Sequence, residues 1–551
     1  MKVLVLFISL LQLSNALNIL IFLLGTNQFE RSIFEYIAQQ LALRHHNVIS
    51  VKPILIPEEP RLVKPKLHLV REKVIKNVLP KDLYEPLEKA VPNVAWKEGY
   101  DTNEYLKPYY TAHNASCYKM LNSNLLDSLK KESLDLAIVY SGNPCLNALT
   151  HLIALPTIYF DTEGFSDETL VASGTPVNLD HEPSNCKISK QSNPFFAKMR
   201  ATVCYLEEYL AQADIPVISK FASTRSSHLD LPITSMFAND YTIKKRFKNF
   251  PNVNLLKQES HVFLLNTDPL LEPSRALPSN VIPVGGLHID HPKPLFAPWN
   301  TSIEAAEEGM IIVSLGTQAD HSKMNVKQAK AILGALSKLT KYRIYWRVGP
   351  NMNLNGINVG NVPSHINLTT FIPQNDLLAH RACKLFVTNG GMASVMEAVV
   401  HGVPIVGIPL YGSNRHNLEK VANKGLGLVV EKDSLSEASL LTAMKKVLDG
   451  TKYKLTAKEM SKEFKSRPAA PFETFLHVVE HLGKHHSFAY FKGESEPILR
   501  RLDFYVLLAI VFLPFIILHF AFGVIFKALF RRASSHAPYV PNVQKETKKT
   551  K

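Results

Sequence analysis

The sequence predicts an α/β protein with two parallel-sheet domains and a C-terminal transmembrane helix. A strand–loop–helix–strand pattern opens the chain after residue 18, and a similar order recurs after residue 303. At 551 residues the chain exceeds what one hydrophobic core usually holds, so two domains are expected. Residues 504–526 contain no Asp, Glu, Lys or Arg, which is typical of a membrane-spanning helix.

Residues 1–16 predict a secretory signal peptide. Lys2 precedes an apolar run at residues 3–13, and the small residues Ser14 and Ala16 follow it. A buried first strand is the alternative, but residues 19–24 form a better strand pattern immediately afterwards. We therefore expect the first domain to comprise residues 17–289.

The first domain is predicted to begin with a βαβ unit. After the strand at residues 19–24 comes a loop at 25–31, and then Ile33, Ile37 and Leu41 recur at a spacing of four, which indicates a helix. Residues 57–120 have weak periodicity and predict an inserted helical or loop region. The remaining expected elements are strands at 48–51, 134–140 and 153–160, a helical segment at 194–222, and a last strand at 262–266.

A second domain is expected at residues 303–465. Residues 290–302 are rich in proline and lack periodicity, so they predict a linker. The second domain is predicted to contain strands at 310–315, 343–346, 385–388, 405–408 and 427–430, with helices at 326–339 and 436–448. Residues 466–503 are expected to contain helices that return to the first domain.

The apolar segment at residues 504–526 is long enough to cross a bilayer as a helix. Pro514 interrupts it, but one proline is tolerated in lipid. Lys527, Arg531 and Arg532 follow the segment and place the tail at 527–551 in the cytosol. The tail ends in residues 548–551, Lys-Lys-Thr-Lys, which resemble a dilysine retrieval signal; a merely solvated basic tail is the alternative. The prediction is a single-pass type I protein of the endoplasmic reticulum membrane with lumenal domains.

The net charge of +14 gives little support to nucleic-acid binding. Seven Lys or Arg residues and Glu546 make the tail +6, so much of the basic balance reflects membrane topology. In a lumenal chain, glycosylation is expected at Asn114, Asn300 and Asn367, which begin Asn-X-Ser/Thr sequences. Five cysteines permit at most two disulfides, and the sequence does not fix their pairing.

A glycine turn at residues 389–391 is the strongest chemical signal. It follows the apolar strand at 385–388 and opens a helix that carries Ser394 and Glu397. Glycines at such a turn let backbone N–H groups approach a ligand, and a helix N-terminus favours negative charge. The turn therefore suits a phosphate or diphosphate, although a strand-Gly-Gly-helix turn also occurs in ordinary α/β architecture.

Residues 371–417 resemble the donor-binding signature of the UDP-glucuronosyltransferases, the membrane-bound animal branch of the UDP-glycosyltransferases in glycosyltransferase family 1. Supporting matches lie at 277–278, 284–288, 313–317 and 346–347. The resemblance implies a GT-B fold, in which two Rossmann-like domains face a cleft. It implies N-terminal acceptor binding and C-terminal UDP-sugar binding.

This resemblance also implies an activity. A hexose or glucuronic acid would pass with inversion from a UDP-sugar to a small lipophilic acceptor, without a metal or other cofactor. Homo- or heterodimers are a further possibility that the resemblance raises. The alternative is a catalytically impaired member that acts as a UDP-sugar-binding or dimerising scaffold, because several of the family's functional positions are substituted here.

The resemblance assigns the uridine contacts to three residues. Phe371 would stack on uracil where the family has tryptophan, Gln374 would lie beside it, and Glu397 would bind the ribose hydroxyls. A solvated helix carboxylate is the alternative for Glu397.

At the positions that the resemblance assigns to the diphosphate and the sugar, this chain has other residues than the family. Asn389 stands where the family has histidine, so a charge-assisted contact becomes a neutral one. Ser413 and Asn414 stand in place of an Asp-Gln pair for the sugar hydroxyls. Arg347 is expected to be structural. Further backbone and hydroxyl donors for the diphosphate are expected from Ser314, Thr317, Gly390, Gly391 and Ser394.

The family's catalytic dyad is absent. Its histidine position falls at or near Glu30, and the position of its orienting acid falls at Tyr140. Glu30 would act as a general base if burial raised its pKa, and a solvated loop residue is the alternative. His477, His481 and His485 are spaced by four on a predicted helix, but the absence of an acidic or cysteine partner in the sequence argues against zinc.

Overall fold

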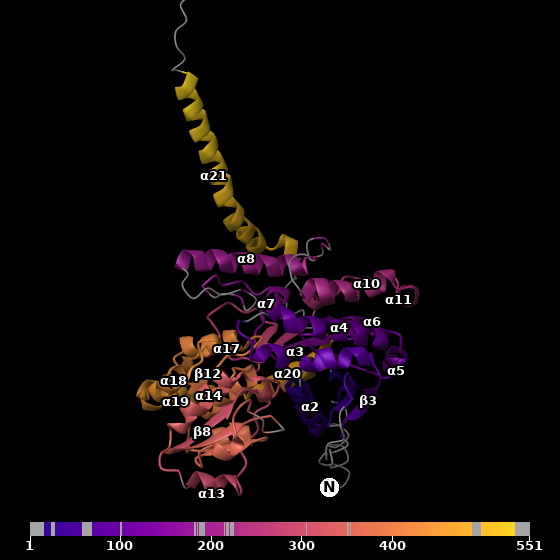
Figure 1. Ribbon diagram of the computed structural model, residues 1–551. Helices are drawn as coiled ribbons and strands as arrows, with labels where there is room; N and C mark the ends of the chain where they lie inside the picture. Colours follow the sequence, from indigo (N-terminus) through magenta and orange to yellow (C-terminus); the bar gives the residue numbers. More distant parts are fainter. Residues whose placement is uncertain are drawn as a thin grey trace, which may run out of the picture.

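A computed structural model of the chain contains two parallel-sheet domains and a long C-terminal helix (Figure 1). It describes residues 16–23, 28–57, 69–99, 102–180, 193–213, 225–304, 306–349, 354–486 and 498–534, together with a few single residues between these ranges. The predicted signal peptide, apart from Ala16, and the predicted dilysine signal lie outside the described residues.

The N-terminal domain is built on a seven-stranded parallel sheet in the order β3-β2-β1-β4-β5-β6-β7. Its central strands are buried and match the predicted apolar runs. The prediction of residues 262–266 as the last strand was wrong, because β7 follows β6 in the sheet. The strands are β1 (Asn18–Phe22), β2 (Asn47–Pro53), β3 (Arg71–Ile75), β4 (Leu136–Tyr140), β5 (Thr157–Asp161), β6 (Val262–Leu265) and β7 (Val281–Pro283).

Helices cover this sheet. In α2 (Gln28–Leu43) the residues Ile33, Ile37 and Leu41 are buried, which confirms the predicted apolar face. The helix begins earlier than predicted, because residues 28–31 of the predicted loop belong to it. The expected insertion at 57–120 contains β3 and two helices, α3 and α4. The other helices are α3 (Tyr84–Ala95), α4 (Thr102–Leu121), α5 (Leu125–Lys130), α6 (Pro144–Leu152), α7 (Asp167–Ser173), α8 (Pro194–Gln212), α10 (Leu231–Asn239), α11 (Tyr241–Arg246) and α12 (Val253–Gln258).

Two disulfides stabilise the N-terminal domain. One joins Cys117 of α4 to Cys145 of α6, and the other joins Cys186 to Cys204 of α8. Cys383 in the second domain is a free thiol. The pairing agrees with the limit of two bridges, and only the fold reveals which cysteines meet.

The C-terminal domain has a six-stranded parallel sheet in the order β10-β9-β8-β11-β12-β13. Five of its strands were predicted, but β10 was not, because it is a short edge strand with mostly half-buried residues. The strands are β8 (Gly309–Ser314), β9 (Tyr342–Arg347), β10 (Ile366–Thr369), β11 (Cys383–Thr388), β12 (Ile405–Gly407) and β13 (Gly427–Val429). The helices are α13 (Trp299–Glu304), α14 (Val326–Ser337), α15 (Gln374–Ala379), α16 (Met392–His401), α17 (Asn414–Asn423), α18 (Glu437–Asp449) and α19 (Thr451–Lys465).

The helix α20 (Pro471–His485) packs against the N-terminal domain. Phe475, Val479 and Leu482 join the hydrophobic core of that domain, and Arg44, directly after α2, pairs with Glu473 at 2.6 Å. A Cβ atom at Gly483 would lie 2.5 Å from the side chain of Leu17, so α20 packs closely on the start of the first strand at this glycine.

Buried contacts hold the two domains together. The ammonium of Lys432 donates to the carbonyls of Val94 and Ala95 at the end of α3, both at 3.3 Å. A cation at a helix C-terminus is favourable because the last carbonyls are otherwise unpaired. On another side of the interface, Lys420 of α17 pairs with Glu272 of the N-terminal domain at 2.5 Å, and both side chains are buried.

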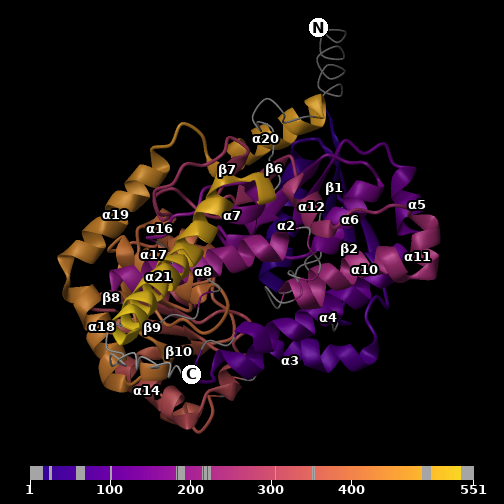
Figure 2. The same ribbon diagram turned by 90° about the horizontal axis from the view of Figure 1, so that it is seen from above.

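The last described helix is α21 (Leu502–Ser534), which leaves the folded body as a single rod (Figures 1 and 2). Of the residues that the structure describes, only Leu502–Ala528 form a helix long and apolar enough to cross a membrane. Its first turns pack on the N-terminal domain through Phe504 and Leu507, and its later apolar residues are exposed. The helix therefore fits a membrane anchor, and its position agrees with the prediction at 504–526.

Candidate functional site

The residues predicted to bind the donor lie at the switch point of the C-terminal sheet, where the chain reverses the direction in which it adds strands. The chain builds β8, β9 and β10 outward, and then returns to place β11 on the other side of β8. Thr388 of β11 pairs with Ser314 of β8, so the turn at 389–391 and the end of β8 lie side by side. Ligands in open α/β sheets bind at such switch points, outside the carboxyl ends of the strands.

The turn after β11 requires glycine at residue 390. Gly390 has φ of 91°, and an added Cβ would lie 2.4 Å from the side chain of Leu418. Its carbonyl accepts a hydrogen bond from Asn417 of α17 at 3.1 Å. Gly391 then caps α16, and a Cβ there would meet nothing within 4 Å. The turn is thus anchored on one side and open on the other.

Gln374, Ser394 and Glu397 form one polar cluster between α15 and α16. The side-chain nitrogen of Gln374 donates to the Ser394 hydroxyl at 3.0 Å and to the Glu397 carboxylate. Burial raises the pKa of Glu397 to about 7, although the hydrogen bond from Gln374 opposes this shift. The carboxyl group therefore titrates near neutral pH.

Phe371 lies three residues before Gln374 and is 69% exposed. Its backbone is fixed by Thr369, whose hydroxyl donates to the Phe371 carbonyl at 2.8 Å. An exposed aromatic ring on a fixed backbone provides a flat apolar face for stacking.

The amides of Asn389 and Asn414 contact each other. Asn389 donates to the side-chain oxygen of Asn414 at 3.1 Å, and the backbone N–H of Tyr411 donates to the same oxygen at 3.3 Å. A Cβ at Gly316 would lie 2.9 Å from the Asn389 amide, so glycine lets the segment after β8 approach. Ser413 is half-buried, and Thr317 is exposed.

The guanidinium of Arg347 donates to the Gly316 carbonyl at 3.0 Å. This contact fits the expected structural role, because it ties the end of β9 to the segment after β8.

The N-terminal sheet has its own switch point between β1 and β4. Tyr140 ends β4 and is buried, and its ring meets the ring of Phe34 edge to face at 6.4 Å. Glu30 lies in the first turn of α2, and its side chain is outside the described residues. The Tyr140 position, where the resemblance predicts an acid, therefore holds an aromatic packing contact.

The turn after β5 approaches the donor side, which sequence reasoning missed. Gly164 has φ of 121°, and a Cβ there would lie 2.9 Å from Met392 at the start of α16. Asp161 organises the turn by accepting hydrogen bonds from the N–H groups of Ser166 at 2.9 Å and Glu163 at 3.2 Å. The sequence signal for this turn was Asp-Thr-Glu-Gly at residues 161–164, in which the aspartate ends the strand and the glycine follows three residues later. Through this turn the carboxyl end of the N-terminal sheet meets the glycine turn of the second domain.

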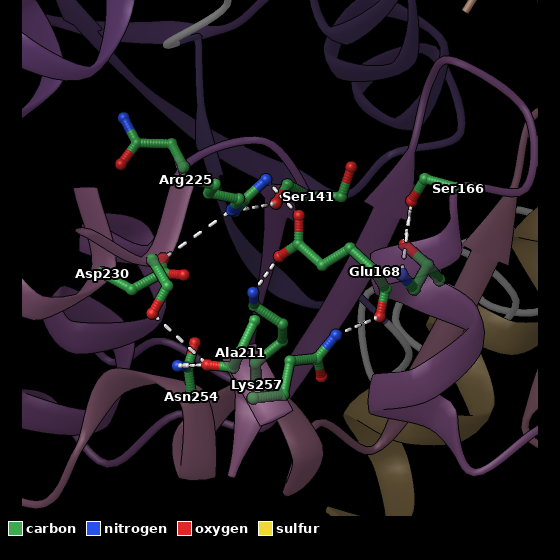
Figure 3. A network of polar contacts seen from close by, with 12 residues as sticks. Ser141, Ser166, Glu168, Ala211, Arg225, Asp230, Asn254 and Lys257 are labelled. Atoms are coloured by element: carbon green, nitrogen blue, oxygen red, sulfur yellow. Dashed lines mark hydrogen bonds and ion pairs between the residues drawn. The ribbon is translucent and has the colours of Figure 1, made fainter. Parts of the chain in front are cut away.

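A buried charge network supports the ends of β4 and β5 (Figure 3). Lys257 of α12 and Arg225 both pair with the carboxylate of Glu168 in α7, and Lys257 is fully buried. Arg225 also donates to the carbonyl of Ser141, directly after β4, at 3.4 Å. Gln212 of α8 donates to the Glu168 carbonyl at 3.0 Å. The partners are far apart in sequence, so no local pattern indicated this network.

Residues 31–534 match the family model described as UDP-glucoronosyl and UDP-glucosyl transferase. The chain belongs to this family. Relatives of this UDP-glycosyltransferase include the 2-hydroxyacylsphingosine 1-beta-galactosyltransferase of Mus musculus, which is 26% identical over 91% of this chain and 87% of that protein. UDP-glucuronosyltransferase 3A1 of Bos taurus is also 26% identical, over 67% of this chain and 66% of that protein.

Solved structures confirm the GT-B fold of this UDP-glycosyltransferase. Phytolacca americana UGT2, solved with UDP-2fluoro-glucose and pterostilbene, aligns with a TM-score of 0.55 and 14% identity, covering 85% of this chain and 99% of that one. LpCGTa, solved with UDP, aligns with a TM-score of 0.52 and 13% identity over 85% and 99%. The relatives are enzymes, and the comparisons do not favour the scaffold alternative.

The charge network predicts an asymmetry between two substitutions. Glu168→Gln should lower the free energy of unfolding by about 3–5 kcal/mol, because it leaves the buried Lys257 without a carboxylate. Lys257→Met should cost less, since Glu168 keeps Arg225 as a partner. Denaturant unfolding of the full chain in detergent measures both.

The double variant Glu168→Gln/Lys257→Met serves as the control for that comparison. It should be more stable than Glu168→Gln alone, because no unpaired lysine remains. Equal losses for the two single variants would contradict the proposed dependence on charge pairing.

Proposed function

We propose that this UDP-glycosyltransferase transfers a hexose or glucuronic acid from a UDP-sugar to a small lipophilic acceptor. The observation that carries the proposal is the meeting of Gln374, Ser394 and Glu397 beside the glycine turn at the switch point of the second sheet. Its relatives include a galactosyltransferase of an acylsphingosine and several glucuronosyltransferases, which supports these two sugar classes and an apolar acceptor.

In this proposal the nucleotide binds from Phe371 to the glycine turn. Uracil stacks on the exposed Phe371 ring, and the ribose hydroxyls donate to the ionised carboxylate of Glu397. The diphosphate lies at the turn of Gly390 and Gly391, where the backbone N–H group of Gly391 and the amide of Asn389 are its proposed donors. The N–H group of Gly390 donates to the Thr388 hydroxyl at 3.4 Å. Ser314, Thr317, Ser413 and Asn414 line the sugar end. Because the groups proposed to contact the diphosphate are neutral, its binding relies on hydrogen-bond geometry more than on charge.

Glu30 is proposed as the general base. It occupies the first turn of α2 at the switch point of the N-terminal sheet, where the acceptor would meet the donor. The neighbouring Arg31 pairs with Glu35 at 3.2 Å, so its charge is engaged along the helix. Tyr140 occupies the position of the family's orienting acid, and its packing against Phe34 would fix the start of α2 instead.

The proposed location is the endoplasmic reticulum membrane with both domains in the lumen. The support is the apolar part of α21, residues 504–526, with Lys527, Arg531 and Arg532 after it in the same helix. The two disulfides agree with an oxidising compartment. Asn300 and Asn367 lie in the second domain as candidate glycosylation sites. Asn114 lies on α4, where its amide donates to the His228 carbonyl at 2.6 Å.

An activity assay tests the function and the orientation together. Microsomes that carry the protein should form conjugates of lipophilic alcohols or phenols from UDP-glucose, UDP-galactose or UDP-glucuronic acid. Permeabilisation should raise the rate, because lumenal domains receive little of the charged donor through a sealed membrane. No conjugate above that of empty membranes, with or without permeabilisation, would contradict the transferase proposal. Equal rates in sealed and permeabilised vesicles would contradict the lumenal orientation.

Glu30→Gln should lower kcat by about 100-fold or more, because general base catalysis typically contributes 10²–10⁴-fold. The affinity for UDP should stay unchanged, since Glu30 belongs to the other domain. Glu85→Gln on the surface of α3 provides the control and should keep full activity. Undiminished turnover in Glu30→Gln would eliminate the proposed base.

The affinity for UDP-glucose should rise as the pH increases from 6 to 8. With a pKa of about 7, Glu397 gains its charge in this window and then accepts the ribose hydroxyl protons better. The ionised fraction grows from about one tenth to about nine tenths, so the affinity should increase by up to about tenfold. Isothermal calorimetry measures the change. In Glu397→Gln the affinity should be lower and independent of pH, and an unaltered pH slope in this variant would refute the ribose contact.

A further inference from the structure

The helix α8 crosses the foot of α21 on the surface from which α21 leaves the body (Figure 1). The view from above shows α21 passing over α8, with α10 and α11 on the same side of the body (Figure 2). The ring of Phe504 stacks on Tyr209 of α8 at 6.1 Å, and Leu507 is buried against the N-terminal domain. The start of α21 is therefore fixed relative to α8.

The position of a bilayer follows from the length of α21. A hydrocarbon core of about 30 Å takes roughly 20 helical residues at 1.5 Å each. Counting back from Lys527, the first charged residue after the apolar run, places the other boundary of the core near Leu507. Leu507 packs against the N-terminal domain, so this boundary falls at the level of the surface that α8 forms.

Apolar side chains are exposed on α8. Phe195 and Phe196 are 64% and 66% exposed, and their rings contact each other edge to face at 5.6 Å. Val203 is 42% exposed, and Phe196, Met199 and Val203 recur at the spacing of one helix face. The stripe ends at Glu207, whose pKa is raised by burial. Lys198, between the aromatic pair and Met199, pairs with Asp180 at 2.6 Å.

The helix α11, on the same side of the body (Figure 1), presents an amphipathic aromatic residue and basic side chains. Tyr241 is 78% exposed, and the ammonium of Lys245 lies 5.9 Å from its ring centre. Lys244 and Lys248 are exposed as well. Tyrosine and lysine with apolar stems and polar tips are favoured where a membrane meets water.

We propose that α8 and α11 form a membrane-contact face. Its residues are Phe195, Phe196, Val203, Tyr241, Lys244 and Lys245, together with Lys248, which lies two residues after α11. The aromatic pair and Val203 enter the boundary between headgroups and acyl chains, and Lys244, Lys245 and Lys248 meet lipid phosphates. Continuity with α21 selects the bilayer as the occupant, because the span brings the membrane to this surface. The body would then rest on the membrane in one orientation, independently of the proposed activity.

Site-directed spin labelling of the full chain in phosphatidylcholine nanodiscs tests the proposal. A nitroxide is attached at Phe196→Cys, with Leu513→Cys in the span as the lipid reference and Lys338→Cys, directly after α14, as the water reference. Label attached to the native protein at Cys383 is subtracted. The ratio of collisions with oxygen to collisions with a nickel chelate should be at least threefold higher at 196 than at 338. It should not exceed the ratio at 513.

Two outcomes would overturn the membrane-contact face. A ratio at 196 equal to that at 338 would show that the face lies in water. Spin–spin broadening at 196 that disappears on dilution with unlabelled protein would show that a second copy of the chain covers it. A label at Val203→Cys adds a check, because its ratio should fall toward that of 338 in the Phe195→Ser/Phe196→Ser background. An unchanged ratio there would show that the aromatic pair does not hold α8 in the lipid.

Discussion

The donor side of this UDP-glycosyltransferase depends on the absence of side chains at a crowded turn. Gly390 adopts a backbone conformation that favours glycine, and it lies against Leu418 with no room for a Cβ atom. Gly316 allows the segment after β8 to approach Asn389 in the same way. These close approaches bring two strand ends and three helices to one point. The polar side chains at that point can then face a common ligand.

At several positions this chain differs from the pattern that the sequence resemblance predicts. Where the resemblance predicts a histidine and an Asp-Gln pair, this chain has Asn389, Ser413 and Asn414, and the Asn389 amide donates to the Asn414 side-chain oxygen. Tyr140 replaces an acid with an aromatic ring that packs on Phe34. The ionisable group retained on the donor side is Glu397, and its burial places its titration near neutral pH. Among the residues proposed to contact the donor, Glu397 is therefore the one that can carry a charge.

The N-terminal domain places its charges differently. Lys257, Glu168 and Arg225 form a buried network behind the strand ends, where it connects β4 with α7 and α12. Removing one member of such a network leaves an uncompensated charge in a poorly solvated place. The aromatic residues of α8 lie on the outside of the same domain. The N-terminal domain therefore has a buried charge network in its interior and exposed apolar side chains on α8. This arrangement suits the proposed contact with a membrane surface.

The sequence by itself determined the fold class, most central strands, the apolar helix near the C-terminus and the glycine turn at residues 389–391. These features are local, because hydrophobic periodicity and a glycine turn are set by neighbouring residues. The edge strands β3 and β10 escaped prediction, since half-exposed strands lack a continuous apolar run. Only the tertiary structure paired the cysteines, brought Gln374 to Glu397, joined Lys257 to Glu168 and placed α8 at the foot of α21. Such contacts join residues far apart in the chain, and the order of the strands in each sheet, which decides these contacts, leaves no mark on the local sequence.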